Sequence, residues 1–181
     1  MTNFFKKRSY DLVIMFVTQL AISVFGLALA FAVPVNHEAL RIGTSVFSVL
    51  FYLFLIYMRV WDLGYKDHNA FRRGEKGLSR LEGLYMGLGA NAINFIVALL
   101  ILAGWFLENQ TVDAIAGGAT VAALLSEGMY IGILSTTVNG VALNSVAYMY
   151  FVITIPMIVT ATLAYLAGSH DFKILGSNKK S

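Results

Sequence analysis

The residues best suited to chemistry lie in one charged stretch near the middle of the chain. They are Trp61, Asp62, Lys66, Asp67, His68, Arg72 and Arg73. Within this stretch, Asp62, Asp67 and His68 are residue types that could hold a divalent metal against a phosphate-bearing lipid headgroup. Two acids and one histidine are a pattern of low specificity, so a catalytic interpretation needs further support.

Two other interpretations of this stretch remain open. As a membrane-proximal loop, it would use its basic residues to contact anionic lipid headgroups, each contributing about 1 kcal/mol. As a docking face, it would bind a cytoplasmic protein or a nucleotide. The chain contains no G-x-x-x-x-G-K-[ST] or G-x-G-x-x-G phosphate-binding motif, no H-E-x-x-H zinc motif and no G-x-S-x-G nucleophile motif. The sequence therefore favours the membrane-proximal loop, and we expect no metal site and no cofactor.

The composition indicates where these residues must be positioned. Of 181 residues, 58% are hydrophobic and only 13% are charged, whereas soluble domains carry about a quarter charged residues. The absence of cysteine excludes a disulfide framework and thiolate chemistry. These values exclude a disordered chain and an ordinary soluble enzyme, and they predict an integral membrane protein.

Four apolar stretches approach the roughly 20 residues that a helix needs to cross a bilayer. Their predicted ranges are 12–33, 42–60, 84–107 and 143–166. We therefore expect an all-α, polytopic membrane protein: a single transmembrane domain over 1–181 that forms a four-helix bundle, with short extra helices in the outer segment 108–142.

The basic residues predict the orientation of these spans. Twelve of the thirteen Lys and Arg residues fall at one side of the predicted membrane, and only Arg41 falls at the other. Cytoplasmic loops carry the excess of positive charge. We therefore expect a multi-pass protein of the cell membrane with cytoplasmic N- and C-termini.

Two segments allow alternative interpretations. The first apolar run follows a basic start and precedes Ala30-Phe31-Ala32, as in a signal peptide, but it is longer than the usual signal core of about 7–15 residues. We expect it to remain as a span. The segment 114–135 could be interfacial, re-entrant or a fifth span. Glu127 near its middle argues against a simple span, because a central acid costs about 2.5 kcal/mol or more.

Glycine and asparagine residues are grouped at the start of the third predicted span. Gly83 and Gly87 form a G-x-x-x-G pattern, and Asn91 and Asn94 follow three residues apart. Helix packing is the favoured interpretation, since small residues let helices approach and Asn bonds across them. The alternative is a polar lining for a substrate or ion path. Pro156 is expected to kink the fourth span.

Several short motifs resemble a group of small uncharacterised integral membrane proteins of Gram-positive bacteria. They are Trp61-Asp62-x-Gly64-x-Lys66-Asp67, Lys76-Gly77-Leu78, Gly87-x-Gly89-Ala90-Asn91-x-x-Asn94, and Pro156 followed by Tyr165-Leu166-x-Gly168. The resemblance implies the architecture and no specific site.

Three functions are compatible with these features. The first is a non-enzymatic accessory or interaction subunit of a membrane complex, with anionic lipids, a protein partner or a second copy as its contacts. The second is a transporter or channel component that uses Gln19, Asn91, Asn94 and Glu127. The third is a lipid-headgroup enzyme. The sequence favours the first, and we expect no nucleic-acid partner.

Overall fold

The structure is a computed structural model, and it describes residues 2–34, 36–75, 77, 79–107 and 109–172. It is 82% helical, which confirms the all-α fold. The long helices are α1 (Thr2–Ala32), α2 (Glu38–Arg72), α3 (Glu82–Ala90), α4 (Ala92–Phe106), α5 (Gln110–Glu127) and α8 (Ile155–Ser169). The short elements are η1 (Gly128–Tyr130), α6 (Ile131–Leu134), β1 (Thr137–Val138), β2 (Val141–Ala142), η2 (Leu143–Ser145) and α7 (Met149–Val152).

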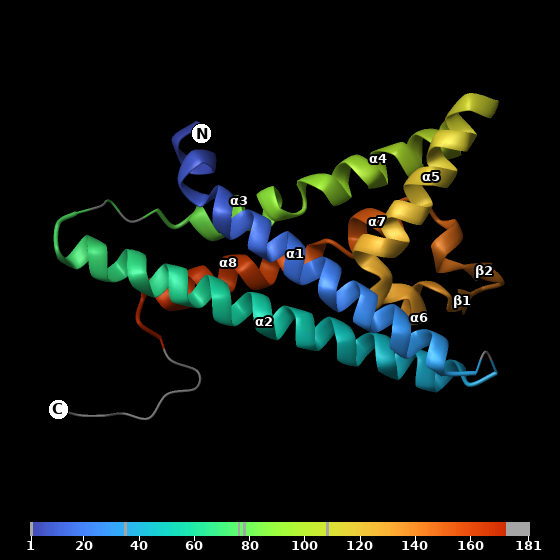
Figure 1. The fold of residues 1–181 in the computed structure, drawn as a ribbon, viewed down its shortest axis with the longest axis horizontal. Coiled ribbons are helices and arrows are strands. Elements are labelled where there is room, and N and C mark those ends of the chain that lie inside the picture. Colours follow the sequence, from blue (N-terminus) through green and yellow to red (C-terminus); the bar gives the residue numbers. More distant parts are fainter. Residues whose placement is uncertain (1, 35, 76, 78, 108, 173–181) are drawn as a thin grey trace.

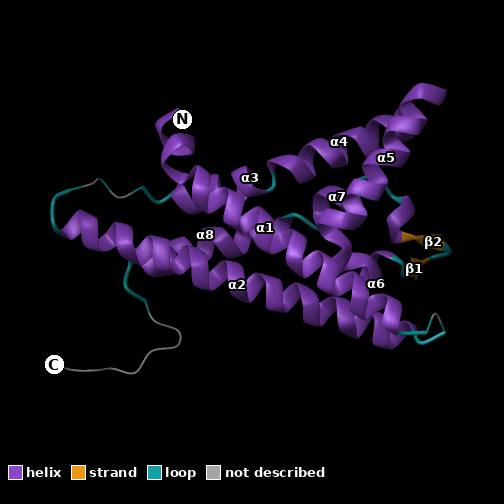
Figure 2. Ribbon diagram, in the orientation of Figure 1, coloured by secondary structure: helices purple, strands orange, loops and turns teal. Residues whose placement is uncertain are grey.

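Four helical stretches of the described chain are long and apolar enough to cross a membrane. They are Lys6–Ala32, Glu38–Arg72, Gln110–Leu134 and Met149–Ser169, and the bent pair α3 and α4 adds a further candidate. Figure 1 shows α1, α2 and α8 running side by side, with α3 and α4 above them. Figure 2 shows that helix dominates, apart from the small hairpin of β1 and β2. The chain is therefore a multi-pass helical membrane protein.

The two ends of this bundle are distinct. At one end, called here the N-terminal end, lie the start of α1, the end of α2, the start of α3 and the end of α8 (Figure 1). At the opposite end lie the turn between α1 and α2, the end of α4 and the hairpin. The described basic residues other than Arg41 belong to elements at the N-terminal end.

The range 84–107 predicted one continuous span, but the structure divides it into two helices. α3 and α4 meet at Asn91 with a bend of 52°. The amide of Asn91 donates to the carbonyl of Gly87 at 3.0 Å, which satisfies one group near the break. Freed backbone groups in a membrane helix need such partners, so the bend is stabilised from within the protein.

The membrane-proximal loop predicted for the charged stretch from Trp61 to Arg73 is wrong, because all but the last residue of this stretch are helical. α2 continues without interruption to Arg72, so Trp61, Asp62, Lys66, Asp67 and His68 are helical. The helix ends where Gly74 adopts a φ of +75°, the left-handed conformation that commonly ends helices. At 1.5 Å per residue, 35 residues span about 52 Å, well beyond a hydrocarbon core of about 30 Å.

The fourth span is interrupted at Ile153 and Thr154, just before Pro156. Pro156 lies in the first turn of α8, where no intrahelical donor is required. The predicted range 143–166 is divided into η2, α7 and α8, and the α7–α8 junction stays helix-like because the Ile153 amide bonds to Met149 at 3.1 Å.

The segment 108–142 is helical as predicted, but its helices are not all short: α5 has 18 residues, and Gln110–Leu134 is long and apolar enough to cross a membrane. α5 starts beside the end of α4 and leads inward to η1, whose Gly128 amide bonds to Ser23 in the middle of α1. α6 then returns toward the start of α2, where the Gly132 amide bonds to Ser45 at 2.8 Å. The unit of α5, η1 and α6, called here the re-entrant segment, therefore enters and leaves the bundle at the same end.

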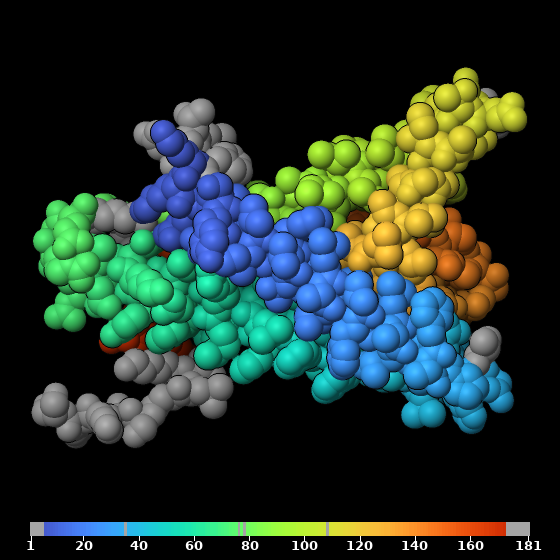
Figure 3. Space-filling model, viewed as in Figure 1, coloured from blue at the N-terminus to red at the C-terminus, as the bar shows by residue number. Residues whose placement is uncertain are grey.

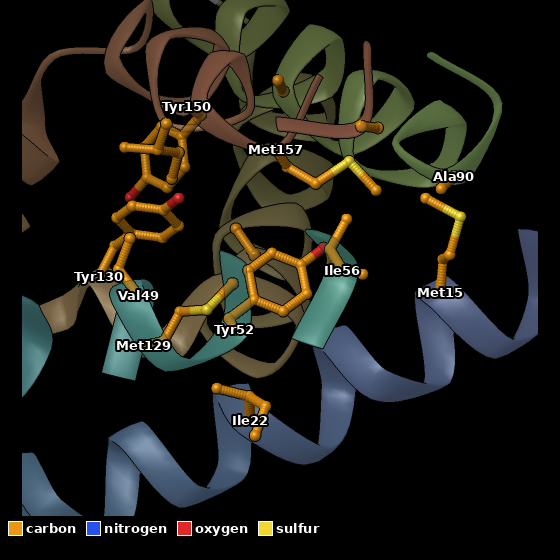
Figure 4. Close-up of a cluster of buried hydrophobic side chains, with 14 of the residues drawn as sticks. Met15, Ile22, Val49, Tyr52, Ile56, Ala90, Met129, Tyr130, Tyr150 and Met157 are labelled. Carbon is orange, nitrogen blue, oxygen red and sulfur yellow. The ribbon is translucent and has the colours of Figure 1, made fainter. Parts of the chain in front are cut away.

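The core lies where α1, α2, the re-entrant segment and α8 meet. Figure 4 shows Tyr52 and Ile56 from α2 facing Met129 and Met157, and both α2 residues are 1% exposed. Many other large apolar side chains are exposed along the outer faces of the helices, as expected for surfaces that contact lipid tails. The space-filling view shows α1 and α2 closely packed along the bundle (Figure 3).

Candidate functional site

A buried charged cluster joins four helices at the N-terminal end. Arg8 from α1 forms ion pairs with Asp67 of α2 and with Glu82 of α3, the latter at 3.0 Å between Nε and Oε1. The hydroxyl of Tyr165 in α8 lies 2.7 Å from Asp67 and 2.9 Å from Glu82. All four residues are at most 7% exposed. Because every member contacts at least one other, the cluster fixes how the helices meet.

A second ion pair extends this cluster toward the surface. Arg59 donates to Asp11 at 2.8 Å, and Asp11 lies 3.6 Å from Arg8. Close packing of small residues brings the same helices together: a Cβ on Gly83 would lie 2.6 Å from the Cβ of Tyr165. The G-x-x-x-G pattern thus serves helix packing, as the sequence favoured.

The residues predicted for catalysis do not converge. Asp67 points into the bundle toward Arg8, whereas Asp62 is exposed and pairs with Lys66 at 2.6 Å. In the ranges that the structure describes, no three His, Cys, Asp or Glu side chains are placed to hold one metal ion. The arrangement therefore gives no support to a metal centre built from Asp62, Asp67 and His68.

The rest of the charged stretch is half-buried at Trp61, Tyr65 and His68 and exposed at Lys66 and from Phe71 to Glu75. Trp61 stacks on Tyr65 with 5.4 Å between ring centroids, and its indole donates to the carbonyl of Phe172 at 2.8 Å. Arg73 bonds to Glu75 through two contacts, and this hydrogen bonding holds the pKa of the Glu75 carboxyl below its usual range. Lys76 and Leu78 of the predicted motif lie outside the described residues.

Asn91 and Asn94 are buried, as their pattern predicted, and they contact each other. The Asn94 amide donates to Asn91 at 3.0 Å, and Asn91 also contacts the sulfur of Met157 at 2.9 Å. The Asn94 carbonyl oxygen has no partner within the described part of the chain. Their contacts with neighbouring helices favour packing over the lining of a path.

The most unusual polar group is Glu127, at the inner end of α5. Its side chain is 4% exposed and lines a cavity of about 200 Å³. Gln19 donates to the neighbouring Ser126 carbonyl at 3.0 Å, and Ser23 and Ser45 accept backbone amides of the re-entrant segment. These contacts place the carboxylate near the middle of α1 and hence deep in the bundle.

Sequence reasoning missed several residues of these sites. Arg8 belongs to the basic start and was given no role of its own, Tyr165 entered only through a motif of the resemblance, and Glu82, Ser23 and Ser45 were not singled out. A signal did exist for the two serines, because polar residues inside an apolar stretch need a partner.

Comparison with known proteins adds no family. The chain matches no protein-family model, and neither a curated protein nor a solved structure matches it. The helices and their apolar lengths therefore define the class, a multi-pass helical membrane protein, and its function is argued from the sites alone.

Proposed function

We propose that this chain is a non-enzymatic interaction subunit of a membrane complex. The observation that carries the proposal is the polar end of α2. This end, defined as residues 66–75, extends beyond α8 in Figure 1 and finishes with five consecutive exposed residues, 71–75. Phe71 is 51% exposed beside Arg72 and Arg73. An aromatic ring flanked by arginines is typical of protein-binding surfaces.

The internal bonding of the acids supports a non-enzymatic role. Asp67 and Glu82 are bound to Arg8 and Tyr165, so neither carboxylate faces a substrate. The remaining acid of the predicted catalytic set, Asp62, pairs with Lys66 at the surface.

The orientation proposed for this role has both termini and the connection between α2 and α3 in the cytoplasm. The gathering of basic residues at the N-terminal end supports it. Because the chain has no native cysteine, single introduced cysteines can be mapped without background. Val138→Cys in the hairpin should react with an impermeant maleimide added to intact cells, and Glu75→Cys should react only after lysis. Labelling of Glu75→Cys in intact cells would reverse the orientation.

Co-purification tests the interaction itself. The full chain is isolated from its native membrane in mild detergent, and accompanying proteins are quantified by mass spectrometry. Replacing Arg72 and Arg73 with Ala should remove a stoichiometric partner while the bundle stays folded. Lys6→Ala with Lys7→Ala is the matched control, since it removes two charges from the same end but from α1. Equal partner recovery from both double variants would contradict the proposal.

A transport or channel component is the second candidate function. The cavity beside Glu127 favours it, because ionisable residues deep in a membrane bundle commonly mark substrate or ion pathways. Flux through reconstituted vesicles, compared between the wild type and Glu127→Gln, tests this candidate; equal flux would remove Glu127 from any path.

A further inference from the structure

The carboxylate of Glu127 is buried without a compensating group in the described chain. No hydrogen bond or ion pair joins it to residues 2–34, 36–75, 77, 79–107 or 109–172, and the ionisable groups that interact with it there are the neutral phenols of Tyr52, Tyr130 and Tyr150. Asp67 and Glu82, the other deeply buried acids, each have Arg8 and Tyr165 beside them. Since an unpaired buried charge is costly, a cation bound beside this carboxylate would stabilise its ionised form.

The space beside Glu127 is a built cavity. It lies between α5, η1, α6, η2 and α7, and its lining is mostly apolar: Val121, Ala123, Leu124, Ile131 and Leu134. Thr120, Asn144 and Tyr150 add a few polar atoms. Small-molecule sites share this combination of an apolar wall with few convergent polar groups.

We propose that this cavity binds a small organic ammonium ion, with its charged nitrogen against Glu127 and its hydrocarbon body against the apolar wall. This inference goes beyond the interaction role of α2 and does not depend on it.

The lining determines which cation fits. An inorganic divalent ion requires about six oxygen ligands, whereas the described lining offers one carboxylate and a few neutral oxygens. An alkylammonium ion needs only one anionic contact for its charge. Tyr150, which is 6% exposed, also lines the cavity, and an aromatic ring beside a cation attracts it through its π system.

The volume sets the size of the ligand. A cavity of about 150 Å³ holds benzene, so the 200 Å³ beside Glu127 fits a ligand slightly larger than benzene. Cyclohexylammonium has this size and is the probe of choice. Cyclohexanol and cyclohexanecarboxylate match its shape while changing the charge.

The re-entrant segment gives such a ligand a route to the site. Thr120 and Val121 line the cavity and are exposed, whereas Ala123 and Glu127 lie deeper and are buried. The carboxylate therefore lies at the closed end of a pocket that opens beside α5.

The test uses the full chain in nanodiscs of zwitterionic lipid, which present no anionic headgroups to the probe. Isothermal titration calorimetry should show saturable binding of cyclohexylammonium and at least tenfold weaker binding of the two analogues. Glu127→Gln keeps the side-chain shape and should weaken the ammonium affinity at least tenfold. Asp113→Asn removes the same charge from the exposed start of α5 and should leave the affinity within twofold.

Several results would overturn the proposal: no saturable binding to the wild type, equal affinity for cyclohexanol, or unchanged affinity in Glu127→Gln. Displacement of the probe by stoichiometric Na⁺ binding would assign the site to a metal ion instead. If Glu127→Gln does not fold, Thr120→Leu serves as the second variant, because an exposed lining residue can be enlarged without disturbing the core. That variant should narrow the pocket and lower the affinity at least tenfold, and unchanged affinity would again refute the assignment.

Discussion

Replacing Arg8 with Met should destabilise the bundle more than any surface charge replacement. Arg8 contacts Asp67, Glu82 and Asp11, and it is 6% exposed. Met keeps the length and apolar stem of the side chain but leaves the buried carboxylates without their cation. Breaking a buried ion pair in this way costs about 3–5 kcal/mol. That loss is a large share of a total stability of about 5–15 kcal/mol.

The loss of stability in Arg8→Met depends on the contacts among Arg8, Asp67, Glu82 and Tyr165. The Tyr165 hydroxyl lies within hydrogen-bond distance of Asp67 and Glu82 and has one proton to donate to them, and a hydrogen bond to a charged group contributes about 1.5–3 kcal/mol. Tyr165→Phe should therefore cost less than Arg8→Met. Neutralising the whole set, as Arg8→Met with Asp67→Asn and Glu82→Gln, should recover at least half of the loss, since replacing all charged members removes the unpaired charge.

The assay is equilibrium unfolding in mixed micelles with increasing denaturing detergent, followed by circular dichroism. Arg73→Met is the control, because its pair with Glu75 is exposed and Arg73 belongs to no buried network; it should leave the midpoint almost unchanged. A loss below about 1 kcal/mol for Arg8→Met, the range of a surface pair, would refute the buried cluster. So would additive losses in the triple variant, because members of one network must couple.

Three further predictions use the same unfolding assay. Gly87→Ala places a methyl group 2.9 Å from the backbone of α8 and should cost about 1–3 kcal/mol, whereas Gly117→Ala has open space and should be neutral or stabilising; equal effects would contradict the close contact. Ser45→Ala leaves the Gly132 amide without its bond and should cost about 1–3 kcal/mol, against little change for the exposed Ser145→Ala; similar values would mean that water replaces the hydroxyl. Asn109→Ala removes the cap that accepts from Thr111 and should cost about 1 kcal/mol, while Asn109→Ser should retain most of it; a neutral alanine would show that the cap is not formed.

The spans were predictable because a helix that crosses a bilayer must be about 20 residues long and mostly apolar. Each of the four predicted ranges is largely helical, but Gln110–Leu134, predicted only as short extra helices, is also long and apolar enough to cross a membrane. The break at Asn91 was not predicted, since Asn in a membrane helix equally suits packing between unbroken helices. Its cause is local: the Asn91 side chain bonds back to the Gly87 carbonyl.

The end of α2 was predicted as a loop because its composition is polar. A helix leaving the membrane needs no apolar face, so charged residues do not mark its end. The pattern did contain a helix signal, as Asp62 and Lys66 are four residues apart and pair on one face. Asn139-Gly140 was a similar missed signal, since this dipeptide favours tight hairpins and both residues have positive φ.

The cluster around Arg8 could not be read from spacing at all. Arg8 and Glu82 are 74 positions apart, and Asp67 and Tyr165 are 98 apart. No local periodicity relates such residues, because only the packing of α1, α2, α3 and α8 brings them together. The sequence predicted that Asp67 lies in a membrane-proximal loop, whereas its side chain is buried between helices.

The two buried acidic sites differ in a way that separates structure from function. At the N-terminal end, Arg8 and the Tyr165 hydroxyl contact Asp67 and Glu82. Both carboxylates are therefore paired within the chain and do not face a ligand. Beside α5, side chains of α1 and α2 hydrogen-bond to the backbone of Ser126, Gly128 and Gly132. None of these bonds involves the Glu127 carboxylate, which lines a cavity. If burial of Glu127 were only an accident of packing, Glu127→Leu would stabilise the protein and change nothing else. If the carboxylate is kept for a ligand, the same change stabilises the protein but abolishes ammonium binding, so stability and binding measured on one variant decide between the two.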